Sequence, residues 1–250
     1  MTLPPDQRLT PEDRERFSRQ LELPDWGEAA QERLRDANVF VAGAGGLGSA
    51  VALYLTAAGV GRITLADPDI VELSNLNRQV LYATSDTGRD KVGAASERLA
   101  SLNPSAAITA LRERVDADSA PGLLAGHNIA IDCLDTLEAR FVLNRAALRL
   151  GIPMVYGAVA GFTGHVSLLE PPATACLECF VPDKEPPTAA PILGCTAGLI
   201  GTLQATEAVK YLAGVGETLA GRLLIVDGLA MKCDVLELQC DPACPACSGR

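Results

Sequence analysis

The chain has 250 residues, 48% of them apolar and 4% aromatic, which is enough to bury a substantial core in one large α/β domain or two small ones. Its formal net charge of −10 argues against nucleic acid as a main partner, because a phosphate backbone needs a basic surface. Gly or charge interrupts every apolar stretch before about 18 residues, and the N-terminus lacks the basic-then-apolar pattern of a signal peptide, so we expect a soluble cytoplasmic protein without a membrane partner.

The first predicted elements are two short helices. Thr10 is suited to cap a helix that begins at Pro11 and carries Glu12 and Asp13 in its first turn. A second helix is expected over residues 28–35.

A glycine-rich turn follows, between an apolar strand over 38–43 and a helix over 46–59 that is apolar nearly all round. The turn has the pattern GxGxxG and contains four glycines: Gly43, Gly45, Gly46 and Gly48. Such glycines let the backbone approach phosphate closely, and the helix N-terminus offers free N–H groups. The alternative is that the glycines serve only helix–strand packing.

An acidic residue, Asp67, ends the next strand (62–67), about twenty residues after the turn. An acid at that position can accept hydrogen bonds from ribose hydroxyls. The turn and Asp67 alone favour NAD or FAD over ATP.

Three polar residues after Asp67 change this preference. Asn75 and Arg78 lie in a polar segment, and Lys91 opens the next predicted helix, where a basic residue opposes the helix dipole. A dinucleotide keeps its pyrophosphate, whereas a triphosphate that is cleaved needs cations to offset the charge of the departing pyrophosphate. The alternative is that Arg78 and Lys91 are solvated surface charges.

Asp135 follows a strand expected over 128–133, so it would lie at the carboxyl edge of a parallel sheet, where ligands bind. An acid there suits Mg²⁺ held together with triphosphate oxygens. The alternative role of Asp135 is to cap the helix that Thr136 opens. These two residues alone leave both roles open.

Strands alternate with helices through the first 155 residues, which implies a parallel sheet with right-handed crossovers. The later strands look antiparallel or mixed. They are expected over 153–159, 164–170, 221–228 and 232–239, with a Pro-rich loop over 171–191 and a long helix over 198–214.

Eight cysteines are present, and four of them form two CxxC pairs: Cys176, Cys179, Cys244 and Cys247. Two such pairs can supply a closed tetrahedral Cys₄ site, so we expect a structural zinc that clips the Pro-rich loop to the C-terminal tail. A redox CxxC is the rival interpretation, but neither pair begins a thioredoxin-like helix. Cys133 is predicted to be a plain core residue.

Together these motifs resemble the MoeB/ThiF/HesA adenylyltransferases, bacterial relatives of ubiquitin-activating enzymes. The resemblance covers about residues 17–247 and rests on "FSRQ", "GAGGLGS", "GVGRITLADPDIVELSNLNRQ", "GRDKV", "LNP", "DCLD", "GTLQATEAVKYLAG" and the two CxxC pairs. It implies an α/β, Rossmann-like nucleotide-binding fold whose mostly parallel sheet is continued by antiparallel C-terminal strands, plus the Cys₄ zinc site. It also implies one adenylation domain over 1–250, divided into N-terminal helices (1–36), a nucleotide-binding half (37–158) and a carrier-binding and zinc half (159–250).

The resemblance implies that the nucleotide is ATP, used with Mg²⁺. Members of this family usually adenylate the C-terminal glycine of a ubiquitin-like sulfur carrier ending in Gly-Gly, and a sulfur donor such as a sulfurtransferase then forms a thiocarboxylate, as in molybdopterin or thiamine synthesis. The roles carried over are the phosphate loop for Gly43, Gly45, Gly46 and Gly48, the ribose for Asp67, the phosphates for Asn75, Arg78 and Lys91, Mg²⁺ for Asp135 and zinc for the four cysteines. Arg19, in "FSRQ", matches an arginine that relatives supply across a homodimer interface.

The chain departs from the family at two places. Relatives usually have Asp-Asn where this chain has Asp135-Thr136, and Thr can still cap the helix. Relatives that form a covalent intermediate often carry a crossover cysteine; without gaps that position falls on Pro187, and with a gap on Cys195. We interpret Cys195 as a small buried residue.

Three other functions remain possible from the sequence. An NAD-dependent dehydrogenase with a structural zinc would explain the glycine turn and Asp67, but neither Arg78 nor Lys91, and neither His127 nor His165 has an evident partner acid. A related adenylating enzyme could act on a tRNA or peptide carboxylate. A catalytically silent adaptor would keep the fold alone.

Overall fold

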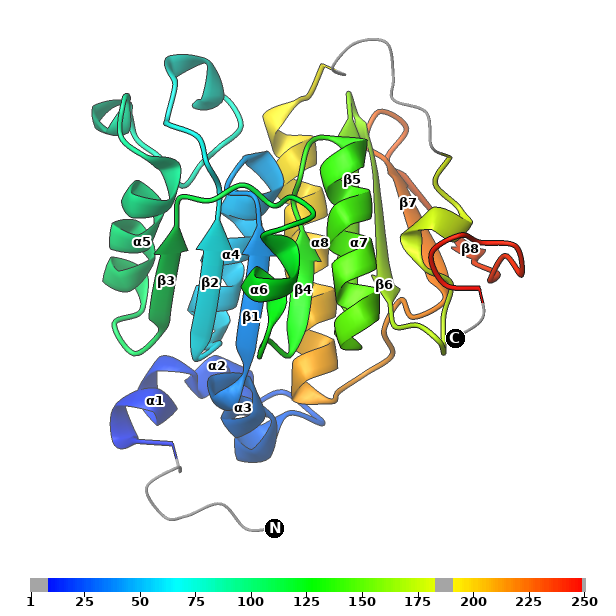
Figure 1. Ribbon diagram of the computed structural model, residues 1–250. Coiled ribbons are helices and arrows are strands. Elements are labelled where there is room, and N and C mark those ends of the chain that lie inside the picture. Colours follow the sequence, from blue (N-terminus) through cyan, green and yellow to red (C-terminus); the bar gives the residue numbers. More distant parts are fainter. Residues whose placement is uncertain (1–8, 183–190, 249–250) are drawn as a thin grey trace.

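The computed structural model describes residues 9–182 and 191–248, which are built around one eight-stranded sheet (Figure 1). Its strands are β1 (Asn38–Ala42), β2 (Arg62–Ala66), β3 (Ala107–Leu111), β4 (Ile129–Asp132), β5 (Met154–Ala160), β6 (Thr163–Leu169), β7 (Arg222–Asp227) and β8 (Lys232–Glu237). The α-helices within the same ranges are α1 (Pro11–Arg16), α2 (Ser18–Leu21), α3 (Gly27–Asp36), α4 (Gly46–Ala58), α5 (Lys91–Leu102), α6 (Ala120–Leu124), α7 (Leu137–Leu150) and α8 (Gly194–Ala213).

The strand order is β3-β2-β1-β4-β5-β6-β7-β8. Strands β1 to β5 pair in parallel, and β6, β7 and β8 continue the sheet in antiparallel pairs. The predicted Rossmann-like architecture is therefore confirmed. Because β1 lies between β2 and β4, the chain changes direction across the sheet at β1, and this is where open α/β sheets bind ligands.

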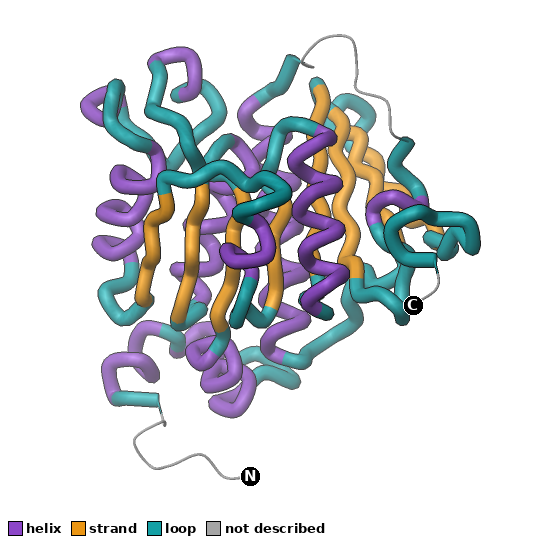
Figure 2. Tube along the Cα trace, viewed as in Figure 1, coloured by secondary structure: helices purple, strands orange, loops and turns teal. Residues whose placement is uncertain are grey.

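Helices cover both faces of the sheet (Figure 2), because side chains along each buried strand alternate between the two faces. Val39 and Val41 of β1 belong to one core, which also contains residues of α4, α5 and α8. Phe40 and Ala42 belong to a second core with residues of α6 and α7. Helices α1, α2 and α3 lie below the amino ends of the strands (Figure 1).

Local signals set several helix ends as predicted. The Thr10 hydroxyl accepts a hydrogen bond from the Asp13 N–H at 3.1 Å, and the Thr10 N–H donates to the Asp13 carboxylate at 2.9 Å, which makes a capping box. Gly59 adopts a left-handed conformation and ends α4. Within the described ranges no helix combines the length and apolarity needed to cross a membrane.

Two elements differ from the sequence expectation. Helix α6 was not predicted, because "APGLL" contains Pro and Gly; Pro121 lies in its first turn, where a missing N–H is tolerated. Helix α8 begins at Gly194, four residues before the predicted start, so it contains Cys195 in its first turn.

Candidate active site

The candidate site lies at the carboxyl edge of the parallel strands, at the top of the sheet in Figure 1. The glycine turn follows β1, Asp67 follows β2, and Asp135 lies three residues beyond β4. The turn and the Asp135 segment are in contact, because a Cβ atom on Gly43 would lie 2.6 Å from the Cys133 carbonyl oxygen. The fold thus assembles segments that lie far apart in the sequence, from Gly43 to Asp135.

The four glycines of the turn have two different roles. Gly43 has φ +96°, and a Cβ on Gly48 would lie 1.9 Å from the Gly43 oxygen, so these two glycines allow the turn to fold tightly on itself. Gly43 and Gly48 are therefore required by close packing, whatever the turn binds. Gly45 and Gly46 lie beside the polar segment after β2: a Cβ on Gly45 would be 3.7 Å from Gln79 Nε2, and one on Gly46 would be 3.7 Å from Arg78 Cγ and 3.1 Å from the Cβ of Ala197 in α8.

The N-terminus of α4 is available to an anion. Gly45 is its N-cap residue and supplies no side-chain cap, so the first N–H groups of a 13-residue helix lack that partner. Such an end carries partial positive charge and binds phosphate. The turn therefore fits the phosphates of a nucleotide.

Asp67 and Lys91 form a buried pair beside the turn. The Asp67 carboxylate accepts hydrogen bonds from the Ala44 N–H at 2.8 Å and the Asp69 N–H at 2.9 Å. Lys91 Nζ lies 2.9 Å from Asp69 Oδ2 and 3.8 Å from Asp67 Oδ1. The Lys91 side chain is only 7% exposed, so its interpretation as a solvated surface charge is wrong.

Asn75 and Arg78 lie in the loop that passes the glycine turn. Asn75 is buried and uses its side-chain oxygen inside a 3₁₀ turn (Leu73–Asn75), where it accepts the Glu72 N–H at 3.1 Å. Arg78 Nη1 donates to the Ser74 carbonyl at 3.0 Å. The Arg78 side chain is half-buried and its Cγ lies next to Gly46, so the stem of this side chain passes the turn while its guanidinium bonds Ser74.

Gln79 is a residue of this site that sequence reasoning missed. It is 4% exposed, and its Oε1 atom has no hydrogen-bond partner in the described part of the chain. A buried polar atom without a partner points to a ligand or water in native proteins. Its position directly after Arg78 in "SNLNRQ" was the signal available.

A second missed feature is the buried ion pair of Asp132 and Arg140. Asp132 Oδ2 lies 3.2 Å from Arg140 Nη1, and Asp132 Oδ1 accepts the Leu134 N–H at 3.1 Å. Arg140 also donates to the Leu134 carbonyl. Burial raises the pKa of Asp132, and the Arg140 guanidinium opposes this rise. Leu134 is therefore held on both sides, which fixes the backbone just before Asp135.

Asp135 itself is exposed, and no hydrogen bond or ion pair of its carboxylate occurs within the described residues. The N-cap of α7 is Thr136, whose hydroxyl accepts the Ala139 N–H at 3.4 Å. The alternative that Asp135 caps this helix is therefore wrong. A carboxylate without a partner among the described residues, two residues beyond the Cys133 carbonyl that approaches Gly43, fits a hard cation such as Mg²⁺.

We expect the Asp135-Thr136 departure from the family to be neutral, because Thr136 already caps α7. Thr136→Asn should leave the free energy of unfolding unchanged, whereas Thr136→Ala should lower it by about 1 kcal/mol through loss of the cap. Urea unfolding of the two variants would measure this difference. Equal stabilities would show that the hydroxyl contributes no cap.

The structure does not bring Arg19 to these residues within one chain. The Arg19 side chain is 93% exposed and lies 3.4 Å from Glu22. The neighbouring Gln20 donates to the Ala58 carbonyl at 3.0 Å, so Arg19 lies by the C-terminal end of α4. The glycine turn is at the other end of this helix, about 20 Å away.

The four predicted zinc ligands do come together, with all sulfur atoms within 4.8 Å of one another. The Sγ–Sγ distances are 3.9 Å for Cys176–Cys179, 3.6 Å for Cys176–Cys244 and 3.5 Å for Cys179–Cys247. A tetrahedron with metal–sulfur bonds of about 2.3 Å has edges of about 3.8 Å, so the cluster fits zinc.

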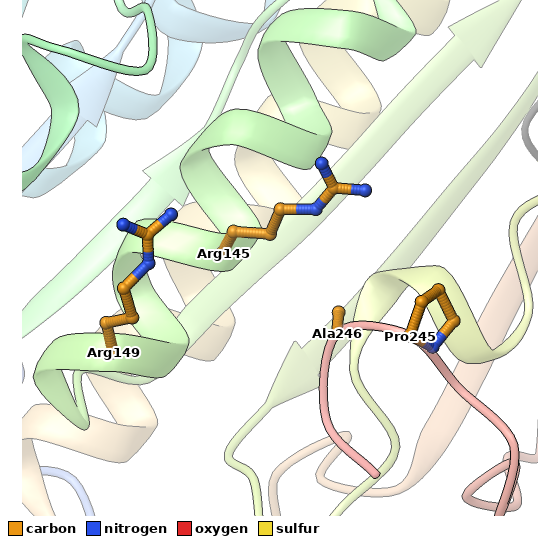
Figure 3. Close-up of a pocket in the computed structure, with 4 residues that line it drawn as sticks. All are labelled: Arg145, Arg149, Pro245 and Ala246. Atoms are coloured by element: carbon orange, nitrogen blue, oxygen red, sulfur yellow. The ribbon is translucent and has the colours of Figure 1, made fainter.

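The first cysteine pair is anchored to α7. Glu178 lies between its two cysteines and accepts from Arg145 Nη2 at 2.6 Å and from Asn144 Nδ2 at 3.1 Å. A cavity of about 200 Å³ lies beside this contact, between α7 and Pro245–Ala246 (Figure 3). Because Arg145 is about nine residues along α7 from its N-cap, this cavity is more than 10 Å from the glycine turn and is a separate feature.

Two cysteines outside the predicted zinc cluster differ in exposure. Cys133 is buried, as predicted. Cys195 is exposed, so its interpretation as a buried residue is wrong; it lies on the outer side of the first turn of α8. The ungapped alternative, Pro187, lies outside the described residues.

Comparison with known proteins gives consistent matches. Residues 17–248 match the ThiF family. The "Sulfur carrier protein adenylyltransferase" of Thermus thermophilus is 40% identical, covering 96% of this chain and 93% of the relative. The "Sulfur carrier protein ThiS adenylyltransferase" of Escherichia coli K12 is 39% identical, covering 94% of this chain and 95% of the relative. The crystal structure of E. coli MccB shares the fold, with a TM-score of 0.86 at 22% identity over 99% of this chain and 76% of that one.

Proposed function

Since this chain belongs to the ThiF family and is an adenylyltransferase, we propose that it activates the C-terminal glycine carboxylate of a ubiquitin-like sulfur carrier ending in Gly-Gly. Three observations support this proposal: Lys91 pairs with Asp67 beside the glycine turn, the Arg78 side chain passes Gly46, and Asp135 follows the segment that contacts Gly43. Cations and a metal-binding acid serve a cleaved triphosphate, whereas a dinucleotide that stays intact does not need them.

In the proposed reaction the glycine carboxylate oxygen attacks the α-phosphorus of ATP. A new P–O bond forms, the bond to the β-phosphate oxygen breaks, and the products are an acyl-adenylate and pyrophosphate. The glycine turn would bind the phosphates through backbone N–H groups, and Asp67 would accept the ribose hydroxyls. Arg78 and Lys91 would offset the charge that accumulates on the departing pyrophosphate.

Lys91 must exchange partners to act in this way, because it is paired with Asp67 and Asp69 in the structure. Asp135 would hold Mg²⁺, which when bound neutralises phosphate charge. Asn75 would act mainly by shaping the loop, since its side-chain oxygen accepts the Glu72 N–H.

The partners follow from the relatives. A sulfur donor, such as a sulfurtransferase, would convert the activated glycine to a thiocarboxylate for a cofactor pathway of the molybdopterin or thiamine type. Residues 159–250 would bind the carrier and hold a structural Zn²⁺ at the four cysteines.

A dehydrogenase is not favoured. His127 lies near the amino end of β4, where its Nε2 atom is 2.9 Å from Thr64 Oγ1, and burial lowers its pKa. It is thus at the opposite end of the sheet from the glycine turn, where it cannot serve as the base of a hydride transfer.

Pyrophosphate–ATP exchange tests the proposal, because the exchange requires a reversible adenylation step. With Mg²⁺ and its cognate Gly-Gly-ended carrier the chain should transfer label from pyrophosphate into ATP, and a carrier lacking the final glycine should give no exchange. Absence of exchange with every small Gly-Gly-ended protein of the host would contradict it.

Arg19 provides a test of the proposed homodimer, since it lies far from the site of its own chain. If each site takes Arg19 from its partner, Arg19→Ala and Asp135→Ala should each be inactive alone. An equal mixture of the two should recover about a quarter of the wild-type exchange rate, because half of the dimers would contain one intact site. A mixture as inactive as its components would exclude a shared site.

A further inference from the structure

Both polar backbone groups of Ala44, in the middle of the glycine turn, are held by side chains from elsewhere. The Ala44 N–H donates to Asp67 at 2.8 Å, and the Ala44 carbonyl accepts the hydroxyl of Tyr82 at 2.8 Å. All three residues are buried. Neither the sequence motifs nor the proposed reaction assigns Tyr82 a role.

This arrangement fixes the direction of a neighbouring N–H group. The Ala44 carbonyl and the Gly45 N–H belong to one planar trans peptide unit, in which they point in opposite directions. Because Tyr82 holds the carbonyl inside the protein, the Gly45 N–H is turned away from Tyr82. No hydrogen bond of this N–H occurs within residues 9–182 and 191–248.

The Tyr82 hydroxyl remains a hydrogen-bond donor at neutral pH. Burial raises the pKa of Tyr82, and the nearby Asp67 carboxylate raises it further, so the phenol keeps its proton throughout the neutral range. The ring packs in the core with α4 and α5 residues, which fixes the hydroxyl in place. Asp67 holds the peptide unit before Ala44, and Tyr82 holds the peptide unit after it.

We propose that Tyr82 is a positioning residue for nucleotide binding: by holding the Ala44 carbonyl it keeps the Gly45 N–H directed at the triphosphate. The inference rests on the proposed function, since it requires ATP at the glycine turn. It predicts that the Tyr82 hydroxyl matters for the phosphates and not for the nucleoside.

The test compares Tyr82→Phe with Tyr211→Phe. The control also loses a phenol hydrogen bond, from Tyr211 to Glu170 at 3.1 Å, but near the far end of α8. Calorimetry gives the Kd of Mg·ATP, and competitive inhibition of pyrophosphate exchange gives the Ki of adenosine. For Tyr82→Phe we expect the Kd of Mg·ATP to rise about five-fold, while the Ki of adenosine stays within about two-fold of wild type.

The remaining outcomes are distinct. An unchanged ATP affinity in folded Tyr82→Phe, or equal weakening of ATP and adenosine, would overturn the inference and leave the proposed function standing. Failure of the wild-type chain to bind Mg·ATP would instead refute the proposed function itself. Thermal unfolding of both variants separates a folding defect from a binding defect.

Discussion

Asp135→Ala is expected to lower the rate of pyrophosphate–ATP exchange by about 100- to 1000-fold, because it removes an exposed carboxylate that follows the segment in contact with the glycine turn and has no partner among the described residues. The backbone before it is fixed by the buried pair of Asp132 and Arg140, so the variant should lose the carboxylate and leave the turn in place. Without this ligand, Mg²⁺ would be held by the phosphates alone, and ATP affinity should fall less than the rate.

A matched control is Glu138→Ala, which removes an exposed acid three residues further on, in the first turn of α7. No role in the site is proposed for Glu138, so the rate of exchange should stay within about two-fold of wild type. Its loss from the first turn of α7 should lower the free energy of unfolding by less than about 1 kcal/mol, through the helix dipole. Circular dichroism and zinc content should be normal for both variants. Near-normal exchange by Asp135→Ala would contradict the proposal that Asp135 holds Mg²⁺.

The fold could be predicted because its signals are local. The β-branched apolar segments before Gly43 and around Ile131 alternate between two cores, and Gly59, Gly151 and Gly214 end three helices in left-handed conformations. Helix α6 escaped prediction because its Pro and Gly normally indicate a turn, whereas its buried Leu123 and Leu124 pack under α7. Tertiary packing outweighed local propensity there.

The candidate site could be predicted only in part, because some of its features are pairings between distant residues. Asp67 and Lys91 were identifiable from motif spacing, but the salt bridges that bury Lys91 were not. Tyr82 looked like an ordinary aromatic residue, and its bond to Ala44 spans 38 positions. Cys195 was misjudged because free cysteines are usually buried, whereas the start of α8 leaves this one in solvent.

The glycine turn illustrates why a motif alone did not determine the nucleotide. Gly43 and Gly48 are needed for close packing whatever the ligand is, so they carry no information on ATP against NAD. The residues that we propose to discriminate between the nucleotides come from other segments, above all Arg78, whose stem passes Gly46, and Asp135, which follows β4. Their positions depend on the strand order, which places β2 and β4 on either side of β1.

Removal of the proposed zinc should cause the largest loss of stability. Cys244 is completely buried within the cluster, whereas β8 just before it is exposed along its whole length and offers the tail little apolar contact. Cys244→Ser should therefore release the C-terminal tail and weaken the docking of Leu177 in the second core. We expect the melting temperature to fall by about 10 °C, equivalent to several kcal/mol for a chain of this size.

The sequence supplies its own control for this experiment. Cys240→Ser changes an exposed cysteine four residues upstream, which joins no metal-ligand cluster in the described part of the chain, and should leave both the melting temperature and the metal content unchanged. Wild type and Cys240→Ser should each contain one zinc per chain by elemental analysis, and a strong chelator should lower their melting temperatures to that of Cys244→Ser. If the chelated wild type melts at the original temperature, the four sulfur atoms hold this part of the chain together by packing, and the metal is dispensable for stability.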